Sequence, residues 1–168
     1  MASRSEEARM TMYQIGPMTQ SQAELIANTW RYEGLYAFYD MDQDEEDLAE
    51  FLDPRAREGN VFTVSQMEDV VGFCSIQTEN GEVEIGFGMR PDLTGRGFGQ
   101  EFVTFLVDYI IKTYHPENIS LAVATFNKRA ITLYERIGFR LTERFDQQTN
   151  GSVYPFIRMV LDVKNLSY

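Results

Sequence analysis

The sequence predicts a single α/β (α+β) domain: a mixed, mostly antiparallel sheet of about six to seven strands with helices on both faces. Three observations support this prediction. Short apolar runs, several of them alternating with polar residues, recur along the chain as strands do. Two later segments, 98–112 and 127–137, instead carry apolar residues at helical spacing. Asn80-Gly81, between two of the strand-like runs, is a strong signal for a two-residue hairpin.

Length and composition agree with one domain. The chain has 168 residues, 43% of them hydrophobic, which is enough for a core. We expect the folded domain to span residues 11–168 and the polar residues 1–10 to form a flexible tail. No apolar run approaches the ~20 residues that a membrane-spanning helix needs, so no membrane partner is expected. The single cysteine, Cys74, lies in an apolar run and fits a buried thiol in a cytoplasmic protein.

The net charge of −11 argues against a nucleic-acid partner. Residues 40–50, here called the acidic segment, contain acids and no base. The acids are Asp40, Asp42, Asp44, Glu45, Glu46, Asp47 and Glu50. They can stabilise the start of a solvated helix, the commoner role of such a run, or attract a cationic substrate. The spacing of the first three resembles a calcium loop, but Glu45 stands where that loop needs glycine, so no metal site is predicted.

The first third of the chain predicts one strand and two helices. Residues 12–15 are strand-like and precede the turn residues Gly16-Pro17. A helix is expected from Thr19, and a second one in the acidic segment, ended by Pro54. Residues 30–39 are rich in aromatic side chains without clean periodicity, which fits either a core cluster or the lining of a pocket.

Three antiparallel strands come next, at 61–65, 70–77 and 82–89. The third alternates, and its glycines Gly86 and Gly88 stand on the face opposite its apolar residues. Glycine weakens a strand unless another backbone or a ligand comes close there, or a bulge bends the strand. The strand-helix-strand order makes 82–89 a parallel neighbour of a strand at 119–126.

A glycine-rich turn joins strand 82–89 to the helical segment 98–112. Its sequence is Thr94-Gly95-Arg96-Gly97-Phe98-Gly99-Gln100. Glycine at alternate positions leaves the backbone N–H groups open to a ligand, and the start of a helix favours negative charge. The turn therefore suits a phosphate or pyrophosphate. By itself it is a weak signal, because many glycine turns only reverse the chain.

The last third of the chain predicts a helix between two strand regions. Asn127 is a good N-cap for this helix, and Gly138 is a good left-handed residue to end it. Strands at 139–145 and 154–163, joined through Thr149-Asn150-Gly151, close the chain.

Several of these motifs together resemble the GNAT acyl-CoA N-acyltransferases. They are Met89-Arg90-Pro91, Gly95-Arg96-Gly97-Phe98-Gly99, Asn127 and Tyr134-Glu135-Arg136-Ile137-Gly138-Phe139. The resemblance is strong over residues 82–139 and loose elsewhere. It implies a GNAT-like domain in which a bulge splays the fourth strand from the fifth and the pantetheine arm of acetyl-CoA enters between them. The glycines of strand 82–89 fit that expectation.

The resemblance also implies a role for each matching residue. The backbone of Phe87 and Met89 is expected to pair with the pantetheine amides, and an amide near Phe87 or Gly88 to polarise the thioester carbonyl. Asn127 is expected to contact the pantetheine arm, and Tyr134 to be the general acid that protonates the departing thiolate. Backbone N–H groups of the turn are expected to hold the pyrophosphate, from Gly95, Arg96, Gly97, Phe98, Gly99 and Gln100. From spacing alone, Tyr134 fits a core aromatic residue better; its position seven residues after Asn127 and just before Gly138-Phe139 favours the general acid instead.

Two departures from the family pattern affect the chemistry. Thr94 stands where the glycine motif often opens with Arg or Gln, but cradling by the backbone does not depend on that side chain. Ala122 stands where relatives that acetylate ribosomal-protein termini have a glutamate base. Glu84, on the glycine-bearing face of its strand, is then the leading candidate for the general base, with an exposed structural carboxylate as the competing interpretation. His115, in a loop, fits a surface residue better than a catalytic one.

The leading hypothesis is an acetyl-CoA-dependent N-acetyltransferase in which a primary amine attacks acetyl-CoA directly. The acceptor would be an amine of a small molecule or of a protein or peptide, and the acidic segment favours a cationic one. The enzyme would act as a monomer or a homodimer. The alternative is a catalytically weak acyl-CoA-binding sensor, suggested by Ala122. A nucleotide-binding oxidoreductase is disfavoured because the glycine turn follows antiparallel strands late in the chain.

Overall fold

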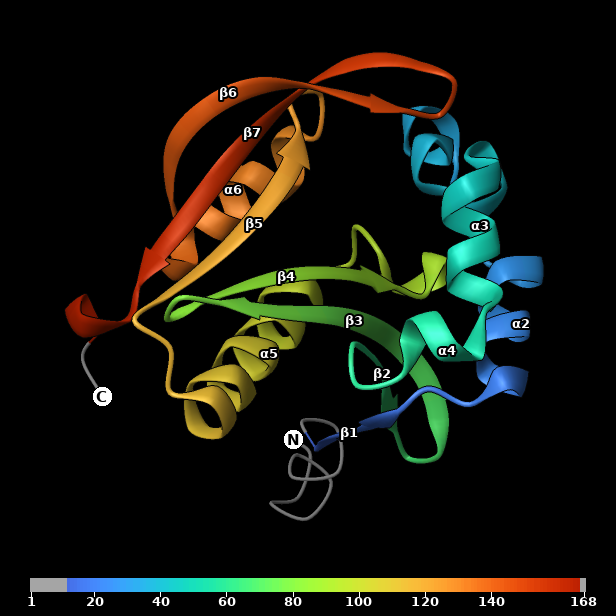
Figure 1. Cartoon of the computed structure of the whole chain (residues 1–168), viewed down its shortest axis with the longest axis horizontal. Coiled ribbons are helices and arrows are strands. Elements are labelled where there is room, and N and C mark those ends of the chain that lie inside the picture. Colours follow the sequence, from blue (N-terminus) through green and yellow to red (C-terminus); the bar gives the residue numbers. More distant parts are fainter. Residues whose placement is uncertain (1–11, 167–168) are drawn as a thin grey trace. The chain divides into compact units, whose positions relative to one another are not determined.

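The structure, a computed structural model, describes residues 12–166. Its strands form one seven-stranded sheet in the order β1-β2-β3-β4-β5-β7-β6 (Figure 1). The strands are β1 Tyr13–Pro17, β2 Val61–Gln66, β3 Asp69–Glu79, β4 Glu82–Met89, β5 Asn118–Ala124, β6 Arg140–Thr149 and β7 Ser152–Asp162. The helices are α2 Gln20–Thr29, α3 Glu45–Leu52, α4 Pro54–Arg57, α5 Gly99–Tyr114 and α6 Lys128–Ile137, with 3₁₀ turns η1 Gly34–Tyr39, η2 Met41–Gln43, η3 Pro91–Leu93 and η4 Val163–Asn165. The predicted fold class, a mixed and mostly antiparallel sheet with helices, is confirmed.

The chain divides into two compact units, and the boundary crosses β3, β4 and the glycine turn. Unit 1 contains the residues up to Ser75 together with Phe87–Arg96, and unit 2 contains Ile76–Gly86 and the residues from Gly97 onward. Each unit buries apolar side chains of its own. The predicted tail, residues 1–10, lies outside the described residues.

Helix α2 of unit 1 begins as its sequence predicts. The Thr19 hydroxyl oxygen accepts the Gln22 N–H at 3.1 Å, and the Gln22 side-chain oxygen accepts the Thr19 N–H at 2.9 Å. This capping box satisfies two donors that the first helical turn leaves without partners. The core of the unit forms beside it from Met18, Ala23, Ile26 and Trp30, with Met41, Phe51, Leu52, Val61, Val70 and Phe73 packed against them.

One predicted boundary in unit 1 is wrong, and a second gains a further role. Gly16 and Pro17 do not form a turn but lie in β1, opposite Thr63 and Phe62 of β2. A proline is tolerated there because β1 is the edge strand of the sheet, so the ladder on its outer side loses no hydrogen bond. Pro54 does not only end a helix; it also opens α4, where the first turn needs no N–H from it.

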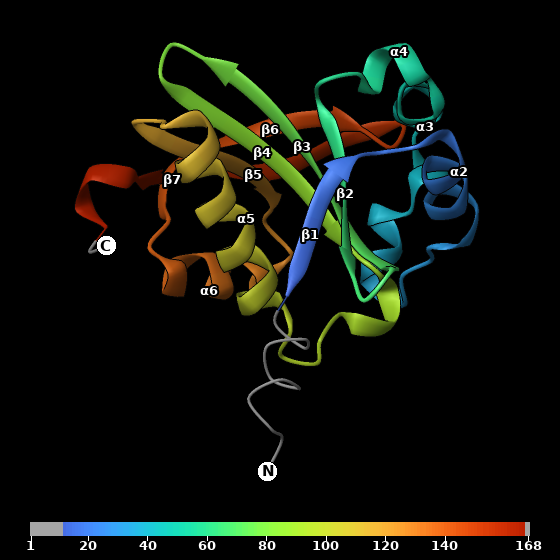
Figure 2. The same cartoon turned by 90° about the horizontal axis from the view of Figure 1, so that it is seen from below.

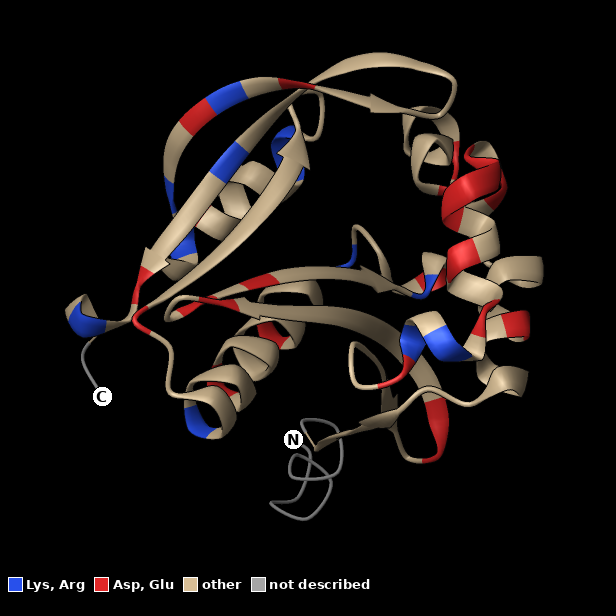
Figure 3. Cartoon of the chain, viewed as in Figure 1, with Lys and Arg blue, Asp and Glu red and all other residues tan. Residues whose placement is uncertain are grey.

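The acidic segment forms η2 and α3, as the commoner interpretation predicts. Asp44 is the N-cap of α3, and its carboxylate accepts the Asp47 N–H at 3.0 Å. Three acids occupy the first turn of the helix, where the helix dipole favours negative charge: Glu45, Glu46 and Asp47. Figure 3 shows acids concentrated on this helix.

Unit 2 contains the parallel pair predicted from the strand-helix-strand order. Its register runs from Glu82 opposite Asn118 to Glu84 opposite Ser120. Strand β5 also pairs antiparallel with β7 along its whole length, and β7 with β6. Figure 2 shows α5 and α6 side by side. Most of the predicted apolar stripe of α5 packs in the core, with Phe102, Leu106 and Ile110 each 0% exposed, whereas Phe98 at the start of the helix is 39% exposed.

Two other local predictions are confirmed. Asn80 and Gly81 both have positive φ, 50° and 81°, as a two-residue hairpin turn requires. Cys74 is fully buried, and this burial raises the pKa of its thiol to about 12. Within residues 12–166, no helix is both long and apolar enough to cross a membrane.

Candidate active site

The carboxyl end of β4, in unit 1, carries the predicted cofactor-binding residues 87–89. Next to them, the Arg90 N–H donates to the Val71 carbonyl oxygen of β3 at 2.9 Å. Between the Asn80-Gly81 turn and this Arg90–Val71 bond, β3 and β4 contain the same number of residues. A strand with a bulge would contain one residue more than its neighbour. In such a regular ladder the backbone groups of Phe87 and Met89 point away from β3. That is the orientation that a contact with a pantetheine arm requires.

Gly88 is explained by a close approach from β3. A Cβ atom placed on Gly88 would lie 2.7 Å from Cε1 and 2.8 Å from Cζ of the Phe73 ring. That ring also contacts Trp30, with centroids 6.0 Å apart, and Phe51, with centroids 5.5 Å apart. The close approach at Gly88 is therefore made by an aromatic side chain, not by the backbone or ligand that the sequence predicts.

Tyr32 reaches the same end of β4 and was not predicted. Its hydroxyl donates to the Met89 carbonyl oxygen at 2.6 Å, and its backbone N–H donates to the Asp40 carboxylate at 2.8 Å. Burial, and next the charge of Asp40, raise the pKa of the Tyr32 hydroxyl well above its ordinary range, so it stays protonated as a donor. The only sequence signal for it was its place in the aromatic run 30–39, for which both core and pocket stayed open.

The glycine turn has the backbone that its sequence predicts. Gly95 has φ 71° and Gly97 has φ 85°, values that favour glycine over every other residue. The exposed Phe98 is the N-cap of α5 and makes no side-chain capping bond, so the first N–H groups of the helix have no side-chain cap. Glycine is favoured at position 99 for a different reason, the lack of space: a Cβ there would lie 3.1 Å from Cδ2 of Leu133.

The polar side chains at the start of the turn bind to the neighbouring residues 90–92 of unit 1. Thr94 donates through its hydroxyl to the Pro91 carbonyl at 2.7 Å, and Arg96 donates to the Asp92 carbonyl at 3.4 Å. Arg90 and Asp92 form an ion pair at 2.6 Å. A hydrogen bond from Arg90 holds the pKa of Asp92 below its usual range. The turn therefore offers backbone N–H groups more than side-chain charge.

The second family motif lies in unit 2 on α6. Asn127 caps the helix as predicted, its side-chain oxygen accepting the Ala130 N–H at 3.2 Å. Gly138 ends it with φ 123°, and its N–H donates to the carbonyls of Tyr134 and Glu135, both at 3.1 Å. Tyr134 is 8% exposed and packs edge-to-face against Phe139 at 6.1 Å. The ring of Tyr134 is thus part of the core. The hydroxyl is the group of this side chain that could donate a proton.

Glu84, the predicted base, is exposed on β4 in unit 2, opposite the buried Ser120 of β5. On the same strand, Glu82 accepts a hydrogen bond from Arg158 of β7 at 2.5 Å. The sequence did not predict this partner. Arg158 pairs in register with Ala122, the position that carries no base. Glu82 is therefore neutralised by an arginine, and Glu84 remains the carboxylate of this strand that is available to accept a proton.

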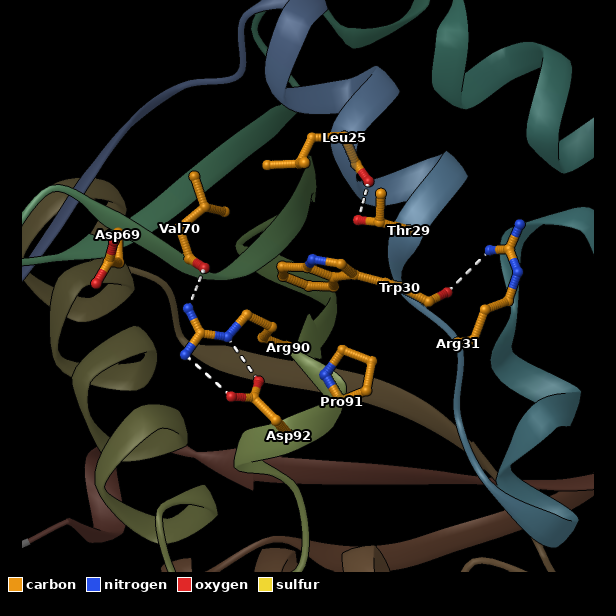
Figure 4. Close-up of a pocket in the computed structure, with 9 residues that line it drawn as sticks. All are labelled: Leu25, Thr29, Trp30, Arg31, Asp69, Val70, Arg90, Pro91 and Asp92. Carbon is orange, nitrogen blue, oxygen red and sulfur yellow. Dashed lines mark hydrogen bonds and ion pairs between the residues drawn. The ribbon is translucent and has the colours of Figure 1, made fainter.

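A hollow of about 480 Å³ opens in unit 1 beside the end of β4 (Figure 4). Its lining is Leu25, Thr29, Trp30, Arg31, Asp69, Val70, Arg90, Pro91 and Asp92. Arg90 is held there by Asp92 and by the Val70 carbonyl at 3.4 Å, while Arg31 donates to the Trp30 carbonyl at 2.9 Å. No residue of the predicted site lines it. The predicted residues instead fall into two groups, 87–96 in unit 1 and Glu84, 97–100, Asn127 and Tyr134 in unit 2.

His115 is confirmed as a surface residue. It is exposed at the end of α5 with φ 48°, and its N–H donates to the Ile111 carbonyl at 3.1 Å. Within the described part of the chain, no group of three or more His, Cys, Asp or Glu side chains gathers in a way that could hold a metal ion.

A family model and a curated relative both match this chain, and both are acetyltransferases. The model of the acetyltransferase (GNAT) domain matches residues 11–140. A curated relative, an uncharacterised N-acetyltransferase p20 of Bacillus licheniformis, is 27% identical over 136 residues, which cover 73% of this chain and 76% of the relative.

Solved structures of similar fold include polyamine acetyltransferases. A spermidine N-acetyltransferase SpeG chimera from Vibrio cholerae and hSSAT has a TM-score of 0.73 at 21% identity, covering 89% of this chain and 95% of that one. Spermidine N-acetyltransferase from Vibrio cholerae in complex with CoA and spermine has a TM-score of 0.70 at 19% identity, covering 90% and 96%. The ribosomal-protein-S5-alanine acetyltransferase from Vibrio fischeri has a TM-score of 0.64 at 15% identity, covering 93% and 96%. At these identities the likeness concerns the fold.

Proposed function

Because the chain belongs to the GNAT acetyltransferase family, we propose that it transfers an acetyl group from acetyl-CoA to a primary amine by direct attack. The single observation that carries this proposal is the glycine turn, within the segment that the family model matches. Gly95 and Gly97 have positive φ, and α5 begins without a side-chain cap. Backbone N–H groups at such a helix start are suited to the pyrophosphate of the cofactor.

When bound, acetyl-CoA supplies an acyl group already activated as a thioester. The residues of this chain would bind and orient it. N–H groups of residues 95–100 hold the pyrophosphate, and the backbone of Phe87 and Met89 pairs with the pantetheine amides. Asn127 would contact the same arm, and the amide of Phe87, which points away from β3, would polarise the thioester carbonyl. Glu84 takes a proton from the acceptor amine, and Tyr134 gives one to the departing thiolate.

The acceptor is proposed to be a cationic amine, with a polyamine as the first choice. Two observations support this. The acidic segment places carboxylates along α3 and before it (Figure 3), and burial together with Asp44, Glu50 and Glu46 raises the pKa of Asp47, as a concentration of negative charge does. In addition, two of the similar folds belong to spermidine N-acetyltransferases, one of them in complex with CoA and spermine.

A thiol-release assay tests the acceptor. With acetyl-CoA present, we expect turnover with spermidine or spermine to exceed that with an aminoglycoside or a basic peptide, and to fall as ionic strength rises, because salt screens the attraction between acceptor and acids. Preferred turnover of a basic peptide would instead make the enzyme a protein acetyltransferase. Release of thiol with none of these amines would count against the proposed function.

Glu84→Gln is expected to lower kcat by about 10²-fold with little change in the KM for acetyl-CoA, because the amide cannot accept the proton of the amine. Glu79→Gln is the matched control, since Glu79 is an exposed carboxylate at the end of the neighbouring strand β3. Steady-state kinetics over a pH series measure both variants. Equal rates for the two would remove Glu84 from the mechanism.

The second candidate function is an acyl-CoA sensor with weak catalysis. The observation that favours it is Ala122, which is exposed on β5 opposite Arg158 and offers no carboxylate. Calorimetry with CoA and acetyl-CoA, run beside the thiol-release assay, separates the two functions. Tight binding without turnover of any amine would favour the sensor.

A further inference from the structure

Strand β6 forms an edge of the sheet and is exposed along nearly its whole length. It has β7 as its one neighbour in the sheet order, at the end of unit 2 that is coloured orange to red in Figure 1. Of its ten residues, all except Phe145 and Thr149 are exposed, on both faces of the strand. Leu141 is 48% exposed, and Val153 of the adjoining β7 is 59% exposed. A long edge of this kind presents backbone N–H and C=O groups to any strand that can pair with it.

The register with β7 determines which residues present those groups. Thr149 and Ser152 close the turn at Asn150 and Gly151, whose φ values are 50° and 76°, so they form a hydrogen-bonded pair. Hydrogen-bonded and non-bonded pairs then alternate along the regular stretch 143–149. The backbone groups of Arg144, Asp146 and Gln148 therefore point to the open edge.

Two details agree with this assignment. Asp146 lies opposite Pro155, which has no N–H to donate and so fits a non-bonded pair with β6. The Pro155 carbonyl instead accepts the Thr125 N–H at 3.0 Å on its other side. The register shift of β6 falls between Leu141 and Glu143, outside the stretch that would pair.

The charges of β6 favour one register for pairing with an identical strand, the one that places opposite charges in facing positions. Antiparallel pairing about a two-fold axis must place outward residues opposite outward residues. With the axis at Phe145, Arg144 stands opposite Asp146 of the partner subunit, and this happens twice. Moving the axis by one residue places either Arg144 opposite Arg144 of the partner subunit or Asp146 opposite Asp146 of the partner subunit. One more step, with the axis at Glu143, brings Glu143 opposite Glu143 of the partner subunit. Opposite charges in facing positions stabilise a strand pair and like charges destabilise it.

We propose that β6 is a homodimer interface, in which it pairs antiparallel with β6 of a second copy about an axis at Phe145. The partner is identified by self-complementary charge: of the three outward residues, two are an arginine and an aspartate, two positions apart. Edges that avoid pairing typically carry charges, most often lysine, or proline or a bulge. Residues 143–149 contain no lysine or proline, their charges are of both signs, and the register shift lies at the boundary of this stretch, between Leu141 and Glu143. The two-fold pairing extends the seven-stranded sheet into a continuous sheet through both copies.

Charge reversal tests the proposal by sedimentation equilibrium of the full chain. Arg144→Asp and Asp146→Arg are each expected to weaken the dimer Kd by at least about tenfold, because each converts two attractive facing pairs into repulsive ones. Mixing the two variants is expected to restore a heterodimer, since the mixture recreates both facing ion pairs. The double variant Arg144→Asp with Asp146→Arg is expected to regain the homodimer.

Arg140→Asp is the matched control, because it makes the same change of charge on the same strand but outside the facing pairs. It is expected to leave the Kd within about twofold, while a larger loss would indicate the register that pairs Arg140 with Asp146 of the partner subunit. Asp146→Pro removes a backbone donor at the open edge together with the carboxylate of the facing pair, and is expected to abolish the dimer with an unchanged circular dichroism spectrum. A wild-type protein that stays monomeric at every concentration, or single reversals that mix without forming a heterodimer, would overturn the proposal.

Discussion

Tyr134→Phe is expected to lower kcat by about 10²- to 10⁴-fold while the affinity for acetyl-CoA stays near that of the wild type. The ring of Tyr134 is 8% exposed and packs against Phe139, and phenylalanine keeps that packing. What the substitution removes is the hydroxyl proposed to protonate the departing thiolate. The measurement is thiol release at saturating acetyl-CoA, together with calorimetric binding of CoA.

Tyr109→Phe provides a control for the loss of a tyrosine hydroxyl, since Tyr109 lies half-buried on α5 and outside the proposed site. Its kinetics are expected to match the wild type. Full activity of Tyr134→Phe would leave Tyr134 as a core aromatic residue and require another acid. A parallel loss of thermal stability and CoA binding would point to the same structural role.

Gly88→Ala is expected to reduce the free energy of unfolding by about 1–3 kcal/mol in the absence of any ligand. The new Cβ would lie 2.7 Å from the Phe73 ring, and that ring is itself confined by Trp30 and Phe51. Urea unfolding of the protein without cofactor measures this effect. Gly16→Ala is the control, because Gly16 is also a strand glycine but has no atom within 4 Å of the added Cβ.

A double-mutant cycle with Phe73→Leu separates the two explanations for Gly88. If the ring is the obstacle, the smaller side chain relieves it, and the double variant is more stable than the sum of the single changes predicts. Gly88→Ala with unchanged stability but weakened CoA binding would instead mean that the glycine serves only the cofactor. The free energy of unfolding without cofactor therefore distinguishes the packing explanation from the cofactor explanation.

The parts of the fold that the sequence predicted correctly depend on local chemistry. Asn80-Gly81 forms the turn because both residues tolerate positive φ, and α6 begins at Asn127 and ends at Gly138 because of cap geometry. The wrong boundary, at Gly16-Pro17, depends on neighbours distant in sequence, because β2 pairs with these residues. A proline that would break a central strand is harmless at the sheet edge formed by β1.

The candidate site divides in the same way. The backbone of the glycine turn follows from its glycines, since Gly95 and Gly97 have the positive φ that glycine tolerates. Tyr32 at the Met89 carbonyl and Arg158 at Glu82 join residues that are 57 and 76 positions apart. No periodicity or spacing in a single sequence relates such residues, because the contact depends on how the strands assemble.

By itself, the sequence determined the element order, the hairpin, the caps, the glycine turn and the family, since each follows from residue types at short range. Only the tertiary structure decided why Gly88 must be glycine, which carboxylate of β4 is already paired, and which groups of β6 point outward. These depend on register and packing between strands. A shift of one residue in register would turn every side chain of a strand to the opposite face.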